Sequence, residues 1–181
     1  VTMDGGAGND SINNSGDNAL FVYSGGNDTI SGFKTNSTLK IASGTLNPVV
    51  ESNGTSLFLN VGENTITLSG AYSLDTLNIV DANNKALTYE IKVVGTDGND
   101  SLRNSKSNVT VEGGAGNDSI NNSGSSVTVL GGAGNDSIYN SSGSVTMNGG
   151  EGSDTIKNNN GSNVTMDGGA GNDSINNSGD N

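Results

Sequence analysis

The chain has 181 residues, a formal net charge of −12 and 29 Gly residues, but only one Pro. It contains no His, Cys or Trp, which excludes a Ser-His-Asp triad, a cysteine nucleophile, an ordinary zinc site and a disulfide framework. The seven basic residues form no phosphate-binding patch, so we expect no nucleic-acid partner, and no apolar run is long enough to span a membrane. With 30% hydrophobic and 4% aromatic residues, the composition alone is typical of disorder.

An internal repeat of 18 residues argues against disorder. The sequence GGAGNDSI occurs at residues 5–12, 113–120, 131–138 and 168–175, and related copies read YSGGNDTI at 23–30, GTDGNDSL at 95–102 and GGEGSDTI at 149–156. The aspartates of successive copies are 18, 72, 18, 18, 18 and 19 residues apart, and 72 is four periods. This regular spacing predicts a solenoid of stacked coils.

We expect each coil to contain two short strands and two turns. In residues 113–130, the glycine-rich stretch 113–118 forms one turn and residues 122–126 form the other. Ile120, Val127 and Val129 face inwards and Thr128 faces outwards, because side chains alternate along a strand. About three aliphatic side chains per coil are too few to order 18 residues, so stability requires stacking and a further source of binding energy.

The repeated aspartate predicts that this source is calcium. Carboxylates stacked coil upon coil repel each other, and a divalent cation between successive turns would remove the repulsion. Calcium accepts six to eight oxygen ligands, including backbone carbonyls that glycine-rich turns can direct inwards, whereas metals that prefer nitrogen or sulfur find no ligands here. Five pairs of aspartates one coil apart predict about five Ca²⁺ ions, whose ten positive charges nearly balance the net charge of −12.

The motif resembles the nonapeptide GGxGxDxUx of the RTX (repeat-in-toxin) family of secreted bacterial proteins. The copies GGAGNDSIN, GGAGNDSIY and GGEGSDTIK carry this resemblance, which covers roughly residues 1–30 and 95–181. It implies an all-β fold, namely a right-handed parallel β-roll or β-helix solenoid of hemolysin-type repeats. It also implies type I secretion and folding outside the cell or at its surface, where calcium is plentiful.

The resemblance further implies which residues bind calcium. The side-chain ligands would be Asp10, Asp28, Asp100, Asp118, Asp136, Asp154 and Asp173. Carbonyl ligands would lie near Gly5, Gly6, Gly8, Gly26, Gly98, Gly113, Gly114, Gly116, Gly131, Gly132, Gly134, Gly149, Gly150, Gly152, Gly168, Gly169 and Gly171. The alternate turns (NNSGSS, NSSGS and NNNGSN) lack the aspartate of the family pattern, so we expect calcium on one edge only. The other edge is predicted to be a ladder of Asn and Ser hydrogen-bonded from coil to coil, with the 19-residue spacing absorbed by a bulged turn in residues 158–163.

Residues 31–94 differ from the rest, because six of the seven aromatic residues lie between Phe21 and Tyr89. One alternative is a separate antiparallel β domain. The other is a continuation of the roll in wider coils without calcium, with a hairpin whose Asn53-Gly54 sequence indicates a type I′ turn. The 72-residue gap, and the likeness of residues 62–66 to residues 26–30 at a separation of 36, favour the continuation. This stretch also resembles the flank that closes RTX rolls at the C-terminal side.

The predicted domains are therefore calcium coils at 1–30, a β-rich section without calcium at 31–94, and calcium coils at 95–181. Residues 164–181 repeat residues 1–18 at all 18 positions, which predicts one period of a tandem array. The predicted function is non-enzymatic: a calcium-stabilised structural repeat unit of an extracellular bacterial rod, adhesin, surface layer or filament. Its expected partners are copies of itself, in a tandem array or a head-to-tail filament, and cell-surface polysaccharide. The alternatives are a secretion and folding carrier module of an RTX enzyme or toxin, and a polysaccharide-binding module.

Overall fold

The computed structural model describes residues 1–74 and 76–179, and the chain forms two compact units, residues 1–91 and 92–181. Asp75, Asp180 and Asn181 lie outside the described residues, so one position of the predicted section 31–94 and the last two positions of the 164–181 repeat are not described. The described part of the chain contains β-strands, one short 3-10 turn and no α-helix, and thus no helix that could cross a membrane. The predicted all-β fold is confirmed.

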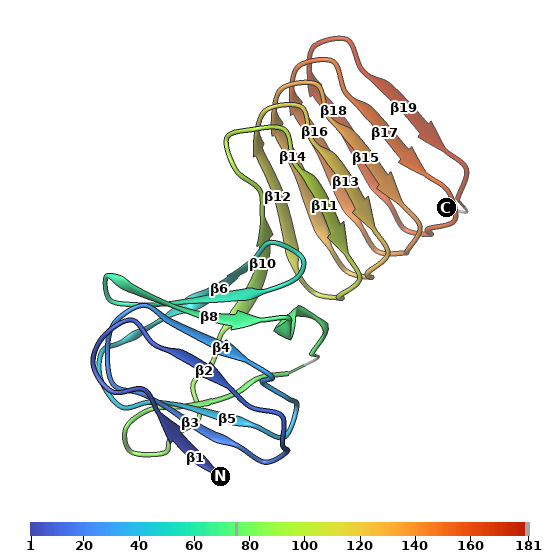
Figure 1. The fold of residues 1–181 in the computed structure, drawn as a ribbon. Helices are drawn as coiled ribbons and strands as arrows, with labels where there is room; N and C mark the ends of the chain where they lie inside the picture. Colours follow the sequence, from blue (N-terminus) through green and yellow to red (C-terminus); the bar gives the residue numbers. More distant parts are fainter. Residues whose placement is uncertain (75, 180–181) are drawn as a thin grey trace. The chain divides into compact units, whose positions relative to one another are not determined.

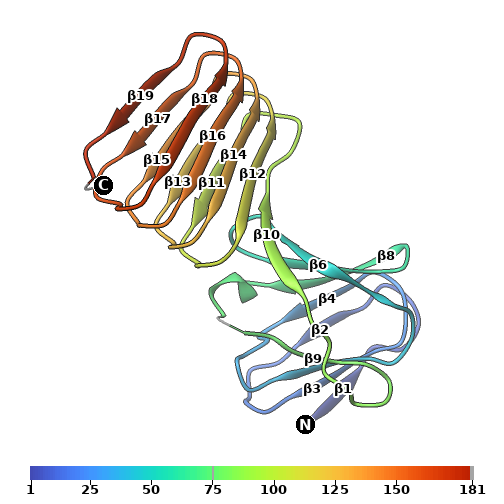
Figure 2. The same ribbon diagram turned by 180° about the vertical axis from the view of Figure 1, so that it is seen from behind.

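Unit 2 consists of two parallel sheets whose strands alternate along the chain (Figures 1 and 2). The strands are β10 (Glu90–Val94), which begins at the end of unit 1, β11 (Ser101–Asn104), β12 (Thr110–Ala115), β13 (Ser119–Asn122), β14 (Thr128–Ala133), β15 (Ser137–Asn140), β16 (Thr146–Glu151), β17 (Thr155–Asn158), β18 (Thr165–Ala170) and β19 (Ser174–Asn177). One sheet has the order β10-β12-β14-β16-β18 and the other β11-β13-β15-β17-β19. Each coil therefore contributes one strand to each sheet, and the predicted parallel solenoid with 18-residue coils is confirmed.

The register of unit 2 places like residues on like. Ile120 pairs with Ile138, and Ile138 pairs with Ile156 in the next coil. These three side chains are fully buried, and Val129 and Met147 form a second buried row in the other sheet. Because strand side chains alternate between faces, this register keeps a narrow core of aliphatic rows between the two sheets.

The glycine-rich turns contain fewer residues than the sequence predicts. Strand β12 continues to Ala115 and β14 to Ala133, so Gly114 pairs with Gly132 instead of standing in a turn. The boundary of the other turn was also wrong, because Asn122 is the last residue of strand β13. Side-chain periodicity marks only the apolar part of a strand, whereas these glycines pair through their backbones.

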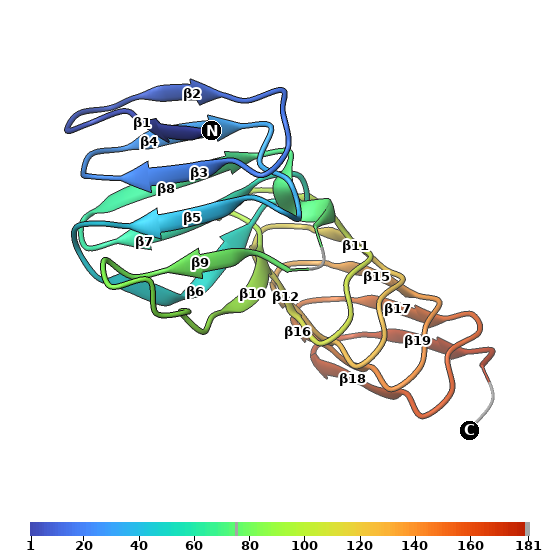
Figure 3. The ribbon, with the colours of Figure 1, turned by 90° about the horizontal axis from the view of Figure 1, so that it is seen from below.

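Unit 1 begins with the same two-sheet arrangement (Figure 3). Its elements are β1 (Thr2–Asp4), β2 (Ser11–Asn13), β3 (Leu20–Tyr23), β4 (Asp28–Ser31), β5 (Thr38–Ile41), β6 (Leu46–Ser52), β7 (Leu57–Val61), β8 (Asn64–Ser69), the 3-10 turn η1 (Ala71–Ser73) and β9 (Asn78–Val80). Strands β1-β3-β5-β9 form one parallel sheet, and β2, β4 and β8 pair in parallel in the other. The roll thus continues through the central section, which was the favoured alternative.

Two antiparallel hairpins interrupt this continuation. Strands β6 and β7 pair antiparallel, and so do β7 and β8. The predicted hairpin is present, but its turn type was wrong: residues 53–56 separate the strands, and of Asn53 and Gly54 only Gly54 has a positive φ, of 83°. A type I′ turn would require a positive φ at both residues.

The predicted equivalence of residues 62–66 with residues 26–30 was also wrong by two residues. Asp28 pairs with Ile66, a separation of 38 rather than 36. Gly62 and Glu63 instead connect β7 to β8, where Val61 pairs with Asn64. A short Gly-rich polar sequence suits a hairpin loop as well as a solenoid corner, so it cannot distinguish the two.

The core of unit 1 is broader than that of unit 2. The rings of Phe21 and Phe33 have centroids 5.4 Å apart, and both side chains are buried. The remaining fully buried large side chains of this unit are Ile30, Leu39, Leu57, Leu59, Ile66, Leu68 and Ile79. Unit 1 is therefore stabilised mainly by apolar packing.

Candidate metal centre

One edge of unit 2 carries a continuous ladder of aspartates. The side chains of Asp118, Asp136 and Asp154 are buried where the glycine-rich turn leads into β13, β15 and β17. The backbone N–H of Asp118 donates to Oδ1 of Asp136 at 2.8 Å, and that of Asp136 donates to Oδ1 of Asp154 at 2.7 Å. The same bond joins Asp100 to Asp118 and Asp154 to Asp173. Each carboxylate therefore uses one oxygen to bind the backbone of the preceding coil.

The second oxygen of these carboxylates is left without a partner. Oδ2 of Asp118, Asp136 and Asp154 is buried and accepts no hydrogen bond in the described part of the chain. Burial raises the pKa of Asp118 and Asp136; the backbone hydrogen bond opposes this rise, and the charges of neighbouring aspartates add to it. An unpartnered buried carboxylate oxygen destabilises the fold unless a cation or donor reaches it.

The first glycine of each repeated motif, near the end of its strand, opens a space beside this oxygen. A Cβ placed on Gly113 would collide with Oδ2 of Asp118 and with the carbonyl oxygen of Gly131 in the next coil. The same collision, with the Asp of the same turn and the carbonyl of the next coil, would occur at Gly131 and at Gly149. A carboxylate oxygen and a carbonyl oxygen therefore converge on one small space per coil, and only glycine leaves that space open.

The donor set of this space is all oxygen with one formal negative charge per coil. No group of three or more acidic side chains that could hold a metal occurs among residues 1–74 and 76–179. Backbone carbonyls would therefore have to supply most ligands, as the sequence predicts. Calcium is the common cation that accepts such a set with loose geometry, so the residues present fit calcium.

The other predicted glycines shape the end of each strand and the turn that follows it. Gly6, Gly8, Gly114, Gly116, Gly132, Gly134, Gly150, Gly152, Gly169 and Gly171 all have φ between 92° and 132°. Gly26 in unit 1 also has a positive φ of 96°. Side chains rarely adopt this backbone region, which explains why these positions are glycine. Gly5 and Gly168 lie beside Oδ2 of Asp10 and Asp173, as Gly113 lies beside Asp118.

The first turn of unit 2 differs from the others. Oδ2 of Asp100 accepts hydrogen bonds from the backbone N–H of Thr96 at 2.6 Å and from its hydroxyl at 2.9 Å. Gly98, predicted to lie near a carbonyl ligand, donates its N–H to the Thr96 hydroxyl at 3.1 Å. Thr96 stands where the complete copies have the second glycine, so this turn satisfies its own carboxylate.

Unit 1 contains a shorter version of the ladder. The N–H of Asp10 donates to Oδ1 of Asp28 at 3.0 Å, and Oδ2 of Asp10 is buried without a partner in the described part of the chain. Asp28 is buried, which raises the pKa of its carboxyl. The structure thus gathers the seven predicted aspartates into two ladders, one of two residues in unit 1 and one of five in unit 2.

A second ladder on this edge was not predicted. The N–H of Asn117 donates to Oδ1 of Asn99, and the N–H of Asn135 donates to Oδ1 of Asn117, both at 2.7 Å. Ser153 continues the line by donating to Asn135 at 2.7 Å. The available signal was the residue before each aspartate, which is Asn in every copy except GGEGSDTI.

The opposite edge carries the predicted uncharged ladder. Nδ2 of Asn122 donates to Oδ1 of Asn140 at 2.8 Å and to the carbonyl of Gly124 at 2.9 Å. The same coil-to-coil bond joins Asn104 to Asn122, Asn140 to Asn158, and Asn158 to Asn177. The prediction of an asparagine ladder is therefore confirmed. The bulged turn is confirmed as well, because Asn158 reaches the carbonyl three residues onwards, at Gly161, rather than two.

Comparison with protein families gives one match. The model described as RTX calcium-binding nonapeptide repeat matches residues 2–20, 94–126, 123–146, 130–164 and 160–181, which together make up more than half of the chain. These ranges contain every predicted aspartate ligand except Asp28. No curated protein matches the chain.

Proposed function

The chain belongs to the family of RTX calcium-binding nonapeptide repeats, and on this basis we propose that it is a calcium-stabilised structural segment of an extracellular bacterial rod, adhesin, surface layer or filament. Repeats of this family bind calcium and are typical of secreted bacterial proteins. The observation that carries the proposal is the row of buried, unpartnered Oδ2 atoms at Asp118, Asp136 and Asp154. Such a row requires a bound cation for a stable fold.

The proposed ions lie between successive turns. One ion would be held by Oδ2 of Asp118 with the Gly131 carbonyl, and the next by Oδ2 of Asp136 with the Gly149 carbonyl, because these oxygens converge on the spaces left by glycine. With one ion for each pair of neighbouring aspartates, we propose about five per chain, at 10/28, 100/118, 118/136, 136/154 and 154/173. Calcium would supply positive charge to a ladder that is otherwise uniformly negative.

The repetition of the site supports a structural rather than a catalytic role. The aspartate and its hydrogen bond to the preceding coil recur throughout unit 2, and the glycines recur in every turn except the first, where Thr96 replaces the second glycine. Catalysis needs different groups that converge on one substrate. A ladder of identical sites instead stabilises the stack along its whole length.

Calcium binding by the full chain tests this function. We expect equilibrium dialysis to show about five Ca²⁺ per chain, with dissociation constants of roughly 10⁻⁴–10⁻³ M as in extracellular calcium modules. Circular dichroism in the same titration should show β-structure forming cooperatively, and magnesium at equal concentration should not replace calcium. A chain that binds no calcium at millimolar concentrations would contradict the proposal.

A glycine variant makes the test specific to the site. Gly131→Ala should lower the number of bound ions, because its new Cβ would collide with Oδ2 of Asp136 and with the carbonyl oxygen of Gly149, the two oxygens that would hold the ion. Gly16→Ala is the matched control, since its Cβ would make only ordinary contacts, the nearest at 3.5 Å to Asn14. Asp136→Asn removes the charge without a clash and should lower the number of ions as well. Unchanged calcium binding in both site variants would refute the assignment of the ligands.

A further inference from the structure

The structure contains the same coil sequence twice, in two different surroundings. Residues 1–16 and 164–179 are identical in sequence. In unit 2 this coil forms β18 and β19, which pair with β16 and β17 of the preceding coil. No described strand pairs with the opposite edge of β18 or β19, and Ile175 is 47% exposed there. In unit 1 the same sequence forms β1 and β2. Here the edge that faces the next coil along the chain, which we call the following edge, is covered by β3 and β4 (Figure 3).

The two occurrences of the coil, in unit 1 and in unit 2, together show the strand pairing at both of its edges. In unit 1, Met3 pairs with Phe21 and Ile12 pairs with Ile30. Phe21 and Ile30 are buried, and Met3 and Ile12 are partly exposed, as is Met166 in the last coil; Ile175, the counterpart of Ile12, is 47% exposed. The following edge of this coil therefore accepts a large apolar surface in one unit and lacks it in the other.

The polar groups of this edge also have identified partners in unit 1. The hydroxyl of Ser24 donates to the carboxylate of Asp4 at 3.2 Å, and the N–H of Asn27 donates to Oδ1 of Asn9 at 2.8 Å. The N–H of Asp10 donates to Oδ1 of Asp28 at 3.0 Å. The counterparts of the three coil residues in the last coil are Asp167, Asn172 and Asp173.

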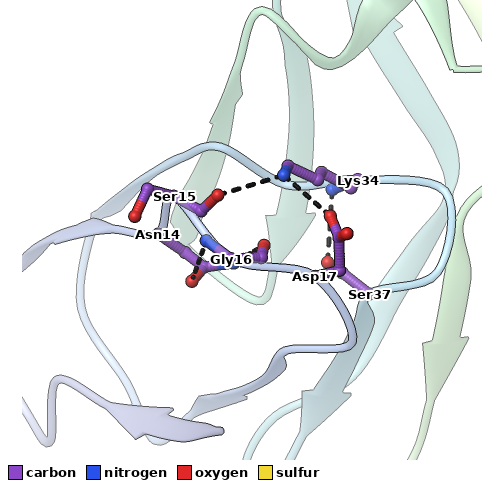
Figure 4. Close-up of polar contacts among 6 residues, drawn as sticks. All are labelled: Asn14, Ser15, Gly16, Asp17, Lys34 and Ser37. Atoms are coloured by element: carbon purple, nitrogen blue, oxygen red, sulfur yellow. Dashed lines mark hydrogen bonds and ion pairs between the residues drawn. The ribbon is translucent and has the colours of Figure 1, made fainter.

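Lys34 closes the asparagine edge of the coil in unit 1 (Figure 4). Its Nζ lies 2.7 Å from Oδ1 of Asp17 and donates to the carbonyl of Ser15 at 3.1 Å. Asn14 forms hydrogen bonds with Gly16 inside its own turn, and the position 18 residues onwards is Gly32, so the asparagine ladder cannot continue. Ser15 corresponds to Ser178, and Asp17 corresponds to Asp180, which lies outside the described residues.

We propose that the following edge of coil 164–179 is the binding surface for residues 19–36 of a second copy of this sequence. The two copies would be joined in tandem, so that residues 164–181 also serve as residues 1–18 of the second copy. Met166 would pair with Phe21 of the second copy, and Ile175 with Ile30 of the second copy, in the register seen in unit 1. Lys34 of the second copy would bind the carbonyl of Ser178 and close the asparagine ladder. This partner rests on the proposed structural function, which it makes specific.

Charge favours residues 19–36 over the end coil of a separate molecule. Residues 164–181 carry Asp167, Asp173 and Asp180 and no basic residue. An identical coil stacked on them would place a second carboxylate against Asp167, outside the proposed calcium ladder, where residues 19–36 offer the Ser24 hydroxyl in unit 1, and like charges at this spacing repel. Residues 19–36 carry one Asp and one Lys, so their net charge is zero, and they bring the buried Phe21–Phe33 pair.

The test is a chain of residues 1–181 extended by a second copy of residues 19–94. In calcium, hydrogen exchange of the amides in β18 and β19 should slow by about tenfold or more relative to the 181-residue chain, because the edge becomes paired and Ile175 becomes buried. A matched extension with Lys34→Glu in the second copy should slow exchange less, since the lysine is a partly exposed surface residue whose replacement leaves the core intact. Unchanged exchange in β18 and β19 of the extended chain would overturn the proposal.

Two further outcomes separate this proposal from others. Sedimentation of the 181-residue chain in calcium measures its oligomeric state. Oligomers that protect β19 without the extension would show that the end coil of another molecule binds this edge, and this result would also overturn the proposal. Calcium binding and the protection of β13–β17 are measured in the same samples. If calcium binding and the protection of β13–β17 are lost, the proposed function is wrong. If both are intact while β19 stays unprotected, only the proposed binding of residues 19–36 is wrong.

Discussion

The two units of the chain share a coil sequence but stabilise it by different means. In unit 1, Phe21 and Ile30 pair with the coil, and the chain continues into hairpins with the fully buried Leu57, Leu59 and Leu68. In unit 2 the stacked coils share a narrow core of Ile, Val and Met rows, and polar ladders line both edges of the stack. The difference shows that an 18-residue coil can be completed either by apolar packing or by charged and amide side chains, the charged ones requiring a cation.

The distribution of buried charge follows from this difference. Asp118, Asp136 and Asp154 are buried in unit 2, whereas among the described residues of unit 1 only Asp28 is buried as a whole residue and Asp10 buries its Oδ2. Without a cation, each buried carboxylate opposes folding, and the raised pKa of Asp118 and Asp136 reflects this penalty. Unit 2 therefore depends on calcium more than unit 1 does, and the following predictions examine that contrast.

Removal of calcium should have the largest effect. In excess chelator, we expect the amides of β13, β15 and β17 to exchange at least about a hundredfold faster, because the stacked carboxylates repel one another and the aliphatic core of unit 2 is narrow. Amides of β7 and β8, which lie among the buried leucines of unit 1, should keep most of their protection. Hydrogen exchange of the full chain, with and without calcium, measures both units in one sample. Equal loss in the two units, or none in unit 2, would contradict the contrast.

Neutralising one aspartate should have a smaller effect whose sign depends on calcium. Asp136 belongs to two pairs of neighbouring aspartates, so Asp136→Asn in about 10 mM calcium should destabilise unit 2 by about 3 kcal/mol. In chelator the same variant should retain more β-structure than the unmodified chain, because it no longer buries a charge. Circular dichroism across a calcium titration measures both effects.

Asp28→Asn provides the comparison in unit 1. Asp28 pairs with Asp10 alone, and its unit has an apolar core, so its loss of stability in calcium should be about half that of Asp136→Asn. Identical shifts of the calcium midpoint for the two variants would argue against ions shared between successive coils. A loss of β-structure in chelator on Asp136→Asn would argue against a buried, unpartnered carboxylate.

The asparagine ladder should contribute stability without affecting calcium. Asn140 accepts from Asn122 at 2.8 Å and donates to Asn158 at 2.9 Å, so Asn140→Ala should destabilise unit 2 by about 1–3 kcal/mol while the number of bound ions stays the same. Asn14→Ala in unit 1 should have an effect below about 1 kcal/mol, since the side chain of Asn14 has hydrogen bonds only to Gly16 of its own turn among the described residues, and its backbone bond to Ser31 is kept in the variant. Urea unfolding in calcium gives the stabilities, and dialysis gives the ion count. A fall in the ion count for Asn140→Ala would show that the two edges are not independent.

Much of unit 2 was predictable because its repeat is strict. The period placed Ile120, Val127 and Val129 in the core and Asp118 in line with Asp136, and the structure has these arrangements. The ladder at Asn99, Asn117 and Asn135 was missed, because an Asn in a Gly-rich turn is expected for its backbone preferences alone. The self-satisfied carboxylate of Asp100 was also missed, since the contact with Thr96 depends on how one turn closes.

The coil length, the inward residues and the edge that carries the carboxylates can all be read from the sequence, because each follows from a period of 18 residues combined with alternation along strands. The pairing of Asp28 with Ile66 and the two hairpins of unit 1 are set by the folded chain, since the aperiodic stretch offers several strand registers of similar hydrophobicity. The folded chain also decides which carboxylate oxygens are left unpartnered, because that depends on the burial and hydrogen bonds of Oδ1 and Oδ2 separately. A one-dimensional repeat specifies neighbours along the stack, whereas the chemistry of each site arises from atoms of two coils brought together in space.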